Sequence, residues 1–325
     1  MFCSKTKNGI RRRFGSSSTA EEVIAGADLG GRVFAITGTT SGIGTLTARC
    51  LVLAGARVLI LNRNKAASEE EIAVLRAEKP DALVEFIHCD LMSIASVERC
   101  AEEILAKKCP LHCLILNAGV LTVERQTTAD GLEASFGVNH VAHFHLTNLL
   151  LPLIRSSAPS KIVILSSDLH AYPGISTSKS AAEKVTELIP TPETNVGGFR
   201  LYCRSKMCNV LTGMKLHRDE HENGIDVYIV HPGFIKTSLN REMGFRGKLI
   251  HTVAGPFIMK NIPEGAATTL FCATHPDAQG LSGFFWENCW MSEIRLRKSF
   301  ARDVELQEEM WRRTVGIIDG IVKKL

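Results

Sequence analysis

The sequence predicts an α/β fold with a single, doubly wound parallel sheet of seven strands and helices on both faces. Seven short runs of aliphatic and β-branched residues alternate with segments of helical periodicity from residue 32 onward, which is typical of strand–helix–strand units. A glycine-rich turn follows the first of these runs. No repeat and no obvious linker divides the chain after residue 30, so a single domain is expected.

The strands and helices can be placed in order along the chain. The expected strands comprise residues 32–37, 57–61, 83–88, 111–116, 161–166, 226–230 and 283–286. Residues 42–55 have helical periodicity and end at Gly55, a common helix stop. Residues 93–108 begin with Ser93 as a cap and end in two lysines, which suit the negative end of the helix dipole. The charge-free stretch 134–154 is long enough to span a membrane, but its Asn, His and Pro residues favour a core helix.

Three segments lie outside this alternating pattern. Residues 1–29 are expected to be a flexible basic segment, because no acid precedes Glu21; a mitochondrial targeting segment is the alternative. Within a domain of residues 30–325, the polar stretch 170–200 is expected to be a lid insertion. The apolar run 249–259 fits either a wall of the substrate pocket or a membrane-facing patch, and the sequence does not separate the two.

The composition is that of an ordinary globular protein and narrows the function classes. Of the 325 residues, 45% are hydrophobic and 22% are charged, which excludes disordered and fibrous chains. The 38 Lys and Arg are interspersed with the 34 Asp and Glu, so no nucleic-acid partner is expected. Ten cysteines without a CxxC pair indicate thiols in a reducing compartment. We therefore expect a cytoplasmic protein without a metal site.

The turn after the first strand, TGTTSGIG (residues 37–44), predicts a dinucleotide site of the Rossmann type. Its three glycines let the backbone approach a pyrophosphate, whose charge then lies against exposed N–H groups and the positive end of the next helix. A glycine trio alone is a weak signal, but its place between the first strand and the first helix is specific. The expected cofactor contacts in this turn are Gly38, Thr40, Ser41, Gly42, Ile43 and Gly44.

The end of the second strand, LILNRN, favours NADP(H) over NAD(H). NAD-binding proteins place an acid here to hold the adenine ribose hydroxyls, whereas this chain has Asn62 and Arg63. Arg63 can pair with a 2′-phosphate through charge-assisted hydrogen bonds. The alternative is a solvated loop arginine with the acid supplied from elsewhere, which leaves NAD(H) open. Further cofactor contacts are expected after the third and fourth strands, at Asp90, Leu91, Asn117, Ala118 and Gly119.

The catalytic chemistry is expected from Tyr202 and Lys206, whose four-residue spacing puts both side chains on one face of a helix. Hydride transfer to a carbonyl leaves charge on oxygen, so the site needs a proton donor and a group that holds this oxygen. Tyr202 can donate the proton, Lys206 can lower its pKa, and Ser167 can hydrogen-bond the substrate oxygen, with Ser166 as an alternative. Asn139 can hold a water that connects Lys206 to solvent, through its amide or through a kink in its helix.

Taken together, TGTTSGIG, NAG, the helical Asn139, ILSS and YCRSK resemble, in spacing and order, the classical short-chain dehydrogenase/reductase family. The resemblance covers residues 30–290 and implies that Tyr202 is the general acid/base and that Lys206 lowers its pKa and holds the nicotinamide ribose. It also implies that Ser167 orients the substrate and that Asn139 completes a proton relay. The segment HPGFIKTSL matches the family's segment after the sixth strand, which implies that the nicotinamide is lined by Pro232, Gly233 and Thr237, with Tyr202 and Lys206 as further cofactor contacts.

The closer resemblance is to the retinol dehydrogenase-like branch, including its members that carry WW modules. It rests on stretches such as DGLEASFGVNHVAHFHLTNLLLPLI and LSGFFWENC. This branch has an insertion between the serine and the tyrosine, which agrees with the separation of 35 residues (202 − 167) between Ser167 and Tyr202. The three tryptophans, Trp286, Trp290 and Trp311, all lie in the C-terminal part. No WW module is therefore expected, and the proline-motif partners of such modules are not carried over.

The resemblance implies an NADP(H)-dependent oxidoreductase that transfers hydride between nicotinamide and a hydrophobic alcohol or carbonyl of the retinoid, steroid or lipid aldehyde class. One alternative is a cofactor-binding regulatory or interaction protein with little turnover. Another is a membrane-attached lipid-processing protein that docks through residues 249–259, so peripheral membrane contact and a mitochondrial or membrane-associated location stay open. Homo-oligomers are common in the family, and the sequence does not fix the assembly.

Overall fold

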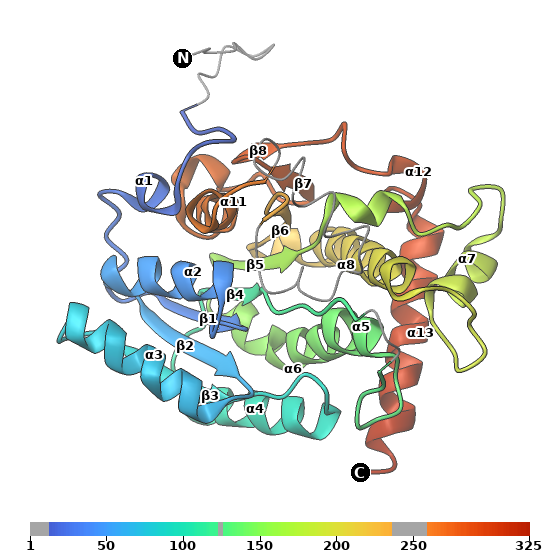
Figure 1. Cartoon of the computed structure of the whole chain (residues 1–325), viewed down its shortest axis with the longest axis horizontal. Coiled ribbons are helices and arrows are strands. Elements are labelled where there is room, and N and C mark those ends of the chain that lie inside the picture. Colours follow the sequence, from blue (N-terminus) through green and yellow to red (C-terminus); the bar gives the residue numbers. More distant parts are fainter. Residues whose placement is uncertain (1–12, 123–125, 236–258) are drawn as a thin grey trace.

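The computed structural model describes residues 13–122, 126–235 and 259–325, and it contains one sheet of eight strands (Figure 1). The strand order is β3-β2-β1-β4-β5-β6-β7-β8. All neighbours from β3 to β7 are parallel, and β8 is antiparallel to β7. The strands are β1 Val33–Thr37, β2 Arg57–Asn62, β3 Val84–His88, β4 Cys113–Leu116, β5 Ser160–Leu165, β6 Ile225–His231, β7 Phe284–Glu287 and β8 Trp290–Met291. The doubly wound α/β prediction is confirmed, and the seven expected strands are present.

The predicted strand number is wrong by one, because β8 follows β7 through a tight hairpin. Its two turn residues, Asn288 and Cys289, have φ angles of 56° and 55°. A two-residue turn with positive φ at both positions matches the twist of paired strands and is usually marked by glycine. This turn contains no glycine, and β8 has only two residues, so the sequence pattern did not reveal it.

Helices cover both faces of the sheet and form three layers (Figure 1). Helices α1 Ala20–Ile24, α2 Gly42–Leu53, α3 Lys65–Glu78 and α11 Ile262–Thr274 lie on one face, and α4 Ile94–Ala106, α5 Ala134–Phe136, α6 His143–Ser156 and α8 Gly198–Glu220 lie on the other. Helices α7 Ala181–Leu188, α12 Lys298–Ala301 and α13 Val304–Val322 pack outside α8. The alternation along β1 shows the two cores: Phe34 and Ile36 face the first layer, and Val33 and Ala35 face the other.

Two sequence-predicted helix features are present. Ser93 caps α4, and its side chain accepts a hydrogen bond from the Ser96 backbone N–H. Gly55, just after α2, has a φ of 90°, a conformation that ends the helix. The charge-free stretch 134–154 folds into α5, a π-helical turn (Gly137–Ala142) and most of α6. In the described parts of the chain, no helix combines the length and apolar character that crossing a membrane requires.

The folded domain begins before residue 30, where the sequence analysis placed its start. Helix α1 begins with a capping box formed by Thr19 and Glu22. Ala20 and Val23 of this helix are buried, and the ring of Phe14 lies 5.9 Å from the ring of Phe271 on α11. Residues 13–29 are therefore part of the folded domain.

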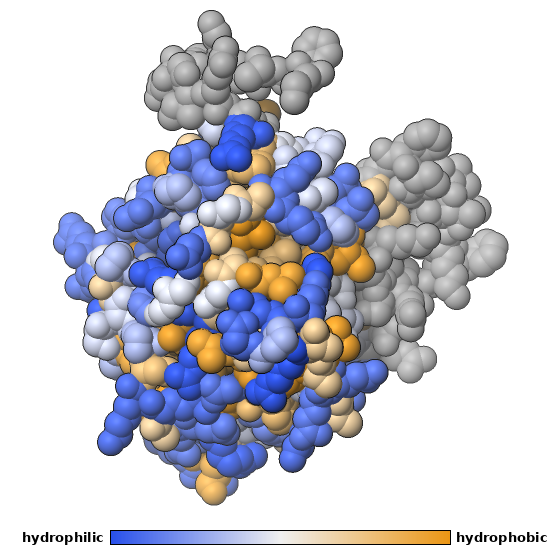
Figure 2. All heavy atoms as spheres, turned by 90° about the vertical axis from the view of Figure 1, so that its left-hand side faces the viewer, coloured by the Kyte–Doolittle hydropathy of each residue, from blue (hydrophilic) through white to orange (hydrophobic). Residues whose placement is uncertain are grey.

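On the surface, positive and negative side chains are interspersed, as the sequence predicts. Figure 2 shows hydrophilic residues over most of the face formed by the left-hand end of Figure 1, with hydrophobic residues gathered toward the middle of this face. Most surface ion pairs in the described residues join neighbouring elements, such as Arg49 of α2 with Glu78 of α3 and Arg57 of β2 with Glu85 of β3.

Candidate active site

A cavity of about 610 Å³ opens at the carboxyl ends of the parallel strands. Its walls come from the segments that follow β1, β2, β3, β4 and β5, together with α8 and the residue after β6. This is the edge of an open α/β sheet at which ligands bind, because the strand order reverses between β1 and β4.

The cavity brings together most of the residues predicted to contact a cofactor. Its wall contains Gly38, Thr40, Ser41, Gly42, Ile43, Gly44, Arg63, Asp90, Leu91, Asn117, Ala118, Gly119, Tyr202, Lys206 and Pro232. Gly233 is adjacent to the wall but does not line it, and Thr237 lies outside the described residues. Of the four predicted catalytic residues, Tyr202 and Lys206 line the cavity, and Asn139 and Ser167 do not.

The glycine-rich turn is locked against the end of β4. Gly38 and Gly42 have φ angles of 71° and 60°, a region that favours glycine. Asn117 donates hydrogen bonds from Nδ2 to the carbonyl oxygens of Thr37 and Gly38, at 2.9 and 2.8 Å. A Cβ at Gly44 would overlap the Gly38 carbonyl oxygen, so only glycine allows this close approach.

The first turn of α2 is suited to an anion. Its N-cap, Ser41, makes no side-chain cap hydrogen bond, and no acidic residue lies in the first turn. The N-terminal N–H groups of α2 are therefore not satisfied by a side chain at the cap, and the positive end of the helix dipole meets the cavity. These residues fit the pyrophosphate of a dinucleotide.

The end of β2 offers a cation and no carboxylate to the cavity. The Asn62 side chain is turned into the protein, where its Oδ1 accepts from the Thr39 N–H and its Nδ2 donates to Thr39 Oγ1, both at 2.8 Å. Arg63 is exposed on the cavity wall and forms no hydrogen bond or ion pair within the described part of the chain. Its guanidinium is therefore available to a phosphate.

Tyr202 and Lys206 lie one turn apart on α8, with both side chains buried. The ammonium Nζ of Lys206 is 5.5 Å from the centre of the Tyr202 ring and donates a hydrogen bond of 3.1 Å to the carbonyl of Leu165 at the end of β5. Burial lowers the pKa of Lys206 to about 8, and no carboxylate in the described residues compensates the loss of solvent. Part of the Lys206 population is therefore neutral near pH 8.

Burial raises the pKa of Tyr202 above its ordinary value, and nearby Cys203 and Asp168 act in the same direction. A hydrogen bond with Ser167 lowers this pKa, but its effect is smaller. The sequence led us to expect that Lys206 lowers the pKa of Tyr202. In this site the effect of burial is larger, so Tyr202 is held as a neutral phenol that can donate a proton.

The two neighbouring serines have different partners. Ser166 donates from Oγ to the backbone carbonyl of Lys206 at 2.9 Å, so it joins β5 to α8. Ser167 caps the short 3-10 helix Asp168–Ala171, and its Oγ accepts a hydrogen bond from the Leu169 N–H at 3.2 Å. The Ser167 side chain also forms a hydrogen bond with the Tyr202 side chain. Ser166 lines the cavity and Ser167 does not, but Ser167 is the serine that forms a hydrogen bond with Tyr202, so it is kept as the candidate for holding a substrate oxygen.

Asn139 lies in the π-helical turn Gly137–Ala142 and is fully buried. Its Oδ1 accepts from the Val120 N–H at 2.7 Å, and its Nδ2 donates to the Val120 carbonyl and to Ser205 Oγ at 2.9 and 3.0 Å. The amide is thus already engaged between the loop after β4 and α8. Of the two roles considered for Asn139, the backbone role is kept: its carbonyl oxygen lies 3.2 Å from His143 Nδ1 and has a second lone pair for a water.

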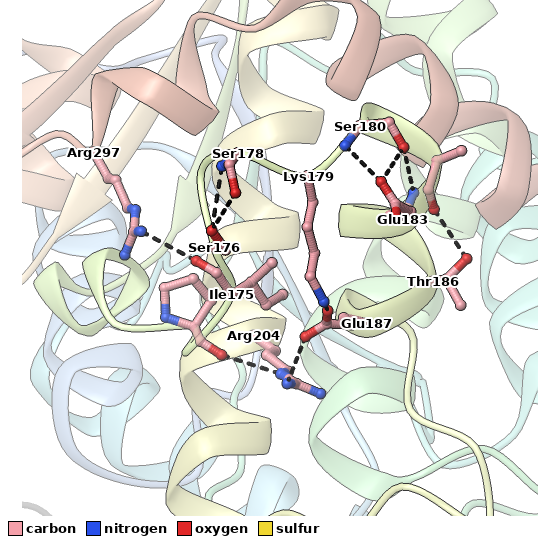
Figure 3. A network of polar contacts seen from close by, with 12 residues as sticks. Ile175, Ser176, Ser178, Lys179, Ser180, Glu183, Thr186, Glu187, Arg204 and Arg297 are labelled. Carbon is pink, nitrogen blue, oxygen red and sulfur yellow. Dashed lines mark hydrogen bonds and ion pairs between the residues drawn. The ribbon is translucent and has the colours of Figure 1, made fainter.

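Arginines hold the predicted lid segment in place: Arg204 joins it to α8, and Arg297 joins it to the chain before α12 (Figure 3). The buried Arg204, which lies between Tyr202 and Lys206, donates from Nε to the Pro173 carbonyl at 3.1 Å. Arg297 donates to the Ala171 and Ile175 carbonyls, and Glu187 of α7 lies 3.7 Å from the Arg204 guanidinium. The predicted lid therefore has a helix of its own. Its sequence signal is the capping box that Ser180 and Glu183 form.

Sequence reasoning missed several residues that the fold carries to the cavity. The wall also contains Val120, Leu121, Thr122, Gln126, Ala134, Val138, Cys89, Met92 and Leu165. Leu165 lies in the ILSS motif, and Ala134 and Val138 lie in the stretch 130–154, but the apolar or neutral side chains of this set carry no sequence signal for binding. His143 does not line the cavity, but it joins two segments of the site: its Nε2 lies 2.9 Å from Thr37 Oγ1 and its Nδ1 lies 3.2 Å from the Asn139 carbonyl oxygen. Its position four residues after Asn139 on the same helix face is the signal that could have found it.

The glycine-rich turn and a buried tyrosine–lysine pair in one cavity of a Rossmann-type sheet are features of nicotinamide-dependent oxidoreductases. Comparison with known proteins agrees with this class. Residues 32–189 match the family described as short chain dehydrogenase. WW domain-containing oxidoreductase of Pongo abelii is 38% identical over 284 residues, which cover 87% of this chain and 68% of the relative. Retinol dehydrogenase 14 of Mus musculus is 34% identical over 316 residues, which cover 92% of this chain and 90% of the relative.

The solved structures agree on the fold. A short chain dehydrogenase from Burkholderia cenocepacia in complex with NADP has a TM-score of 0.63 at 22% identity, covering 79% of this chain and 96% of its own. The chain belongs to the short-chain dehydrogenase/reductase family and is an oxidoreductase that uses a nicotinamide cofactor. The predicted resemblance to the retinol dehydrogenase-like branch and to the WW domain-containing oxidoreductase is confirmed.

Proposed function

We propose that the protein is an NADP(H)-dependent oxidoreductase that transfers hydride between the nicotinamide and a hydrophobic alcohol or carbonyl of the retinoid, steroid or lipid aldehyde class. The observation that carries the proposal is that one cavity contains both the proposed catalytic pair and the residues proposed to bind the cofactor phosphates. Tyr202 and Lys206 line one part of its wall, and the glycine-rich turn with the unpaired Arg63 lines another. The relative named Retinol dehydrogenase 14 supports this substrate class.

The NADP(H) preference rests on the end of β2. Because the Asn62 amide is bound to Thr39, the position that carries an acid in NAD-binding proteins presents no negative charge to the cavity. Arg63, beside it, can form charge-assisted hydrogen bonds with a 2′-phosphate. A preference for NADPH in turn favours the reductive direction.

The apolar substrate class is supported by exposed aromatic side chains near the catalytic helix. Tyr172 in the lid is 61% exposed, Phe199 at the start of α8 is 48% exposed, and Phe234 after the Pro232–Gly233 turn is 44% exposed. Large apolar side chains that stay exposed on a folded domain are typical of a binding surface. A hydrophobic substrate would cover them.

In the proposed mechanism, bound NADPH supplies the hydride that the carbonyl carbon receives. Tyr202 donates its phenolic proton to the carbonyl oxygen, and the Ser167 hydroxyl holds this oxygen by a hydrogen bond. Lys206 in its charged form stabilises the phenolate that Tyr202 becomes. Lys206 then gives up a proton that restores the Tyr202 phenol, and a water held at the π-helical turn around Asn139 returns a proton from solvent to Lys206. Oxidation of an alcohol uses the same groups in reverse.

The test is consumption of NADPH and NADH, followed by absorbance, with retinal, a steroid ketone and medium-chain aldehydes. The proposal expects turnover with at least one hydrophobic carbonyl and a preference for NADPH. Tight NADPH binding without turnover on any of them would favour a cofactor-binding regulatory protein. Co-sedimentation with liposomes would favour a membrane-attached role, and equal use of both cofactors would contradict the role of Arg63.

A further inference from the structure

Glu71 is a buried carboxyl group that the proposed mechanism does not use. It lies on α3, on the side of the helix that faces the glycine-rich turn, with only 9% of the residue exposed. Its Oε2 accepts a 2.6 Å hydrogen bond from Thr39 Oγ1, and its Oε1 has no hydrogen-bond partner among the described residues. A carboxylate in such a place loses most of its hydration and gains one hydrogen bond in return.

Thr39 connects this carboxyl group to the cofactor site. Thr39 Oγ1 accepts a hydrogen bond from Asn62 Nδ2, so its own proton is directed to Glu71. Thr39 stands between Gly38 and Thr40, which both line the cavity, whereas Glu71 does not. The carboxyl group therefore lies directly behind the turn that faces the cofactor phosphates, separated from them by a single residue.

No cation among the described residues pairs with Glu71. The charged and titratable side chains on the elements around it are Lys65, Glu69, Glu70, Arg76 and Glu78 of α3, Arg49 and Cys50 of α2, Arg57 of β2 with Arg63 after it, and Glu85 and His88 of β3. Most of these are engaged with one another, as in the pairs Arg49–Glu78, Arg57–Glu85 and Lys65–Glu69. The pKa of Glu71 is raised to about 7 by burial, against the smaller opposite effect of the Thr39 hydrogen bond.

We propose that Glu71 is a proton-linked positioning residue of the cofactor site, which takes up a proton when the phosphates of the dinucleotide bind in front of Thr39. The inference rests on the proposed function. Negative charge on the cofactor disfavours a second negative charge close behind it, so binding shifts Glu71 toward the neutral acid. The proton comes from the buffer, and a neutral carboxyl group still accepts the hydrogen bond from Thr39.

The sign of the effect follows from linkage. At neutral pH about half of the Glu71 population is ionised before binding and less afterwards, so binding takes up a fraction of a proton. Cofactor affinity must then fall as the pH rises through neutrality. The effect is larger for NADPH than for NADH, because a 2′-phosphate adds about −1.5 to −2 charges.

The experiment is isothermal titration calorimetry of NADPH at pH 7.0 in phosphate and in Tris, whose different ionisation enthalpies report the number of protons taken up. At this pH the charged form of Lys206 dominates, because its pKa is about 8, so Lys206 contributes little uptake. The protein is compared with Glu71→Gln and with the control Glu70→Gln, which removes an exposed carboxylate from the same helix. Titration with NADH, which has no 2′-phosphate, gives a second measurement on the unmodified protein.

The expected result is uptake of several tenths of a proton in the wild type and in Glu70→Gln, and much less in Glu71→Gln. NADPH affinity should fall about tenfold between pH 6.5 and 8.5 in the wild type, and less in Glu71→Gln. Equal uptake in wild type and Glu71→Gln would overturn the inference. If Glu71→Gln does not fold, the wild type alone decides: binding of NADPH and of NADH without any proton uptake would overturn the inference. NADPH that binds without uptake leaves the proposed function standing, whereas failure of either cofactor to bind contradicts both.

Discussion

The ammonium of Lys206 lies 5.5 Å from the centre of the Tyr202 ring, on the same buried face of α8. The four-residue spacing in the sequence dictates this shared face, and the packing of α8 against β5 fixes the depth at which both groups lie. A cation at this distance favours the phenolate over the phenol, and it does so more strongly in a buried site than in water. In the proposed mechanism, the charge state of Lys206 therefore affects how readily Tyr202 releases its proton.

Replacing Lys206 by Met should lower kcat by on the order of 100-fold, because the phenolate loses its nearest cation. The pKa of Lys206 is lowered to about 8, so its charged form is present below that pH and is lost above it. We therefore expect kcat/KM of the wild type to fall above pH 8, and this limb to be absent in the variant. The measurement is a pH–rate profile of both proteins.

The matched control is Lys215→Met on the same helix, whose ammonium pairs with Asp219 and Glu308 at 2.8 and 2.9 Å. It should keep the wild-type kcat and the wild-type pH profile. A Lys206→Met variant with the same profile as this control would contradict the role of Lys206.

Replacing Arg63 by Ala should weaken NADPH binding about tenfold and change NADH binding less than twofold, because one charge-assisted pair with the 2′-phosphate is lost. The control is Lys65→Ala, which removes a nearby cation that pairs with Glu69 and does not line the cavity. The measurement is the dissociation constant of NADPH and of NADH for each protein, followed by nicotinamide fluorescence. Equal losses for the two cofactors would mean that Arg63 does not contact the 2′-phosphate.

Replacing Gly44 by Ala should reduce the affinity for either cofactor at least tenfold and destabilise the fold by about 1–3 kcal/mol, because the new Cβ overlaps the Gly38 carbonyl. Gly316→Ala is the control, since Gly316 lies in α13 with open space around it. That change should raise stability by up to about 1 kcal/mol through helix propensity and leave cofactor binding unchanged. Binding titrations and denaturant unfolding measure both effects, and a Gly44→Ala variant with wild-type affinity would refute the close-approach argument.

Replacing Glu71 by Gln should change how stability depends on pH. The folded-state pKa of Glu71 is raised from 4.5 to about 7, so its contribution is fully present below pH 4.5 and is lost as the pH rises to about 7. Relative to the variant, the wild type should lose up to about 3 kcal/mol of unfolding free energy over this window. Urea unfolding at pH 5 and pH 8 measures it. If the difference in unfolding free energy between the two proteins is the same at both pH values, burial does not raise the pKa of Glu71.

Much of the architecture was predictable because local signals and packing agree. The Ser93 cap, the Gly55 stop and the alternation of apolar strands with helices each have a physical cause that acts over a few residues. The cavity residues with motif signals, from Gly38 to Pro232, were predictable for the same reason. The turn at Asn288 and Cys289 was not, since it has the geometry of a glycine turn without glycine.

The rest of the site depends on contacts between distant segments. The sequence does not distinguish Ser166 from Ser167. In the structure Ser166 donates a hydrogen bond to the Lys206 carbonyl, and this contact depends on how α8 packs against the end of β5. The packing of Phe14 on Phe271 likewise joins residues that lie far apart in the chain. The burial of Glu71 behind Thr39 could not be foreseen from a helix whose other acidic residues, such as Glu69 and Glu70, are exposed.

The most direct test of the central claim is hydride transfer from NADPH to a hydrophobic carbonyl in the wild type and in Tyr202→Phe. We predict that the variant loses turnover by roughly 100-fold or more, because the carbonyl oxygen has no proton donor, while its NADPH dissociation constant stays within about threefold of the wild type. A Tyr202→Phe variant that reduces the same carbonyl at the wild-type rate would contradict the account.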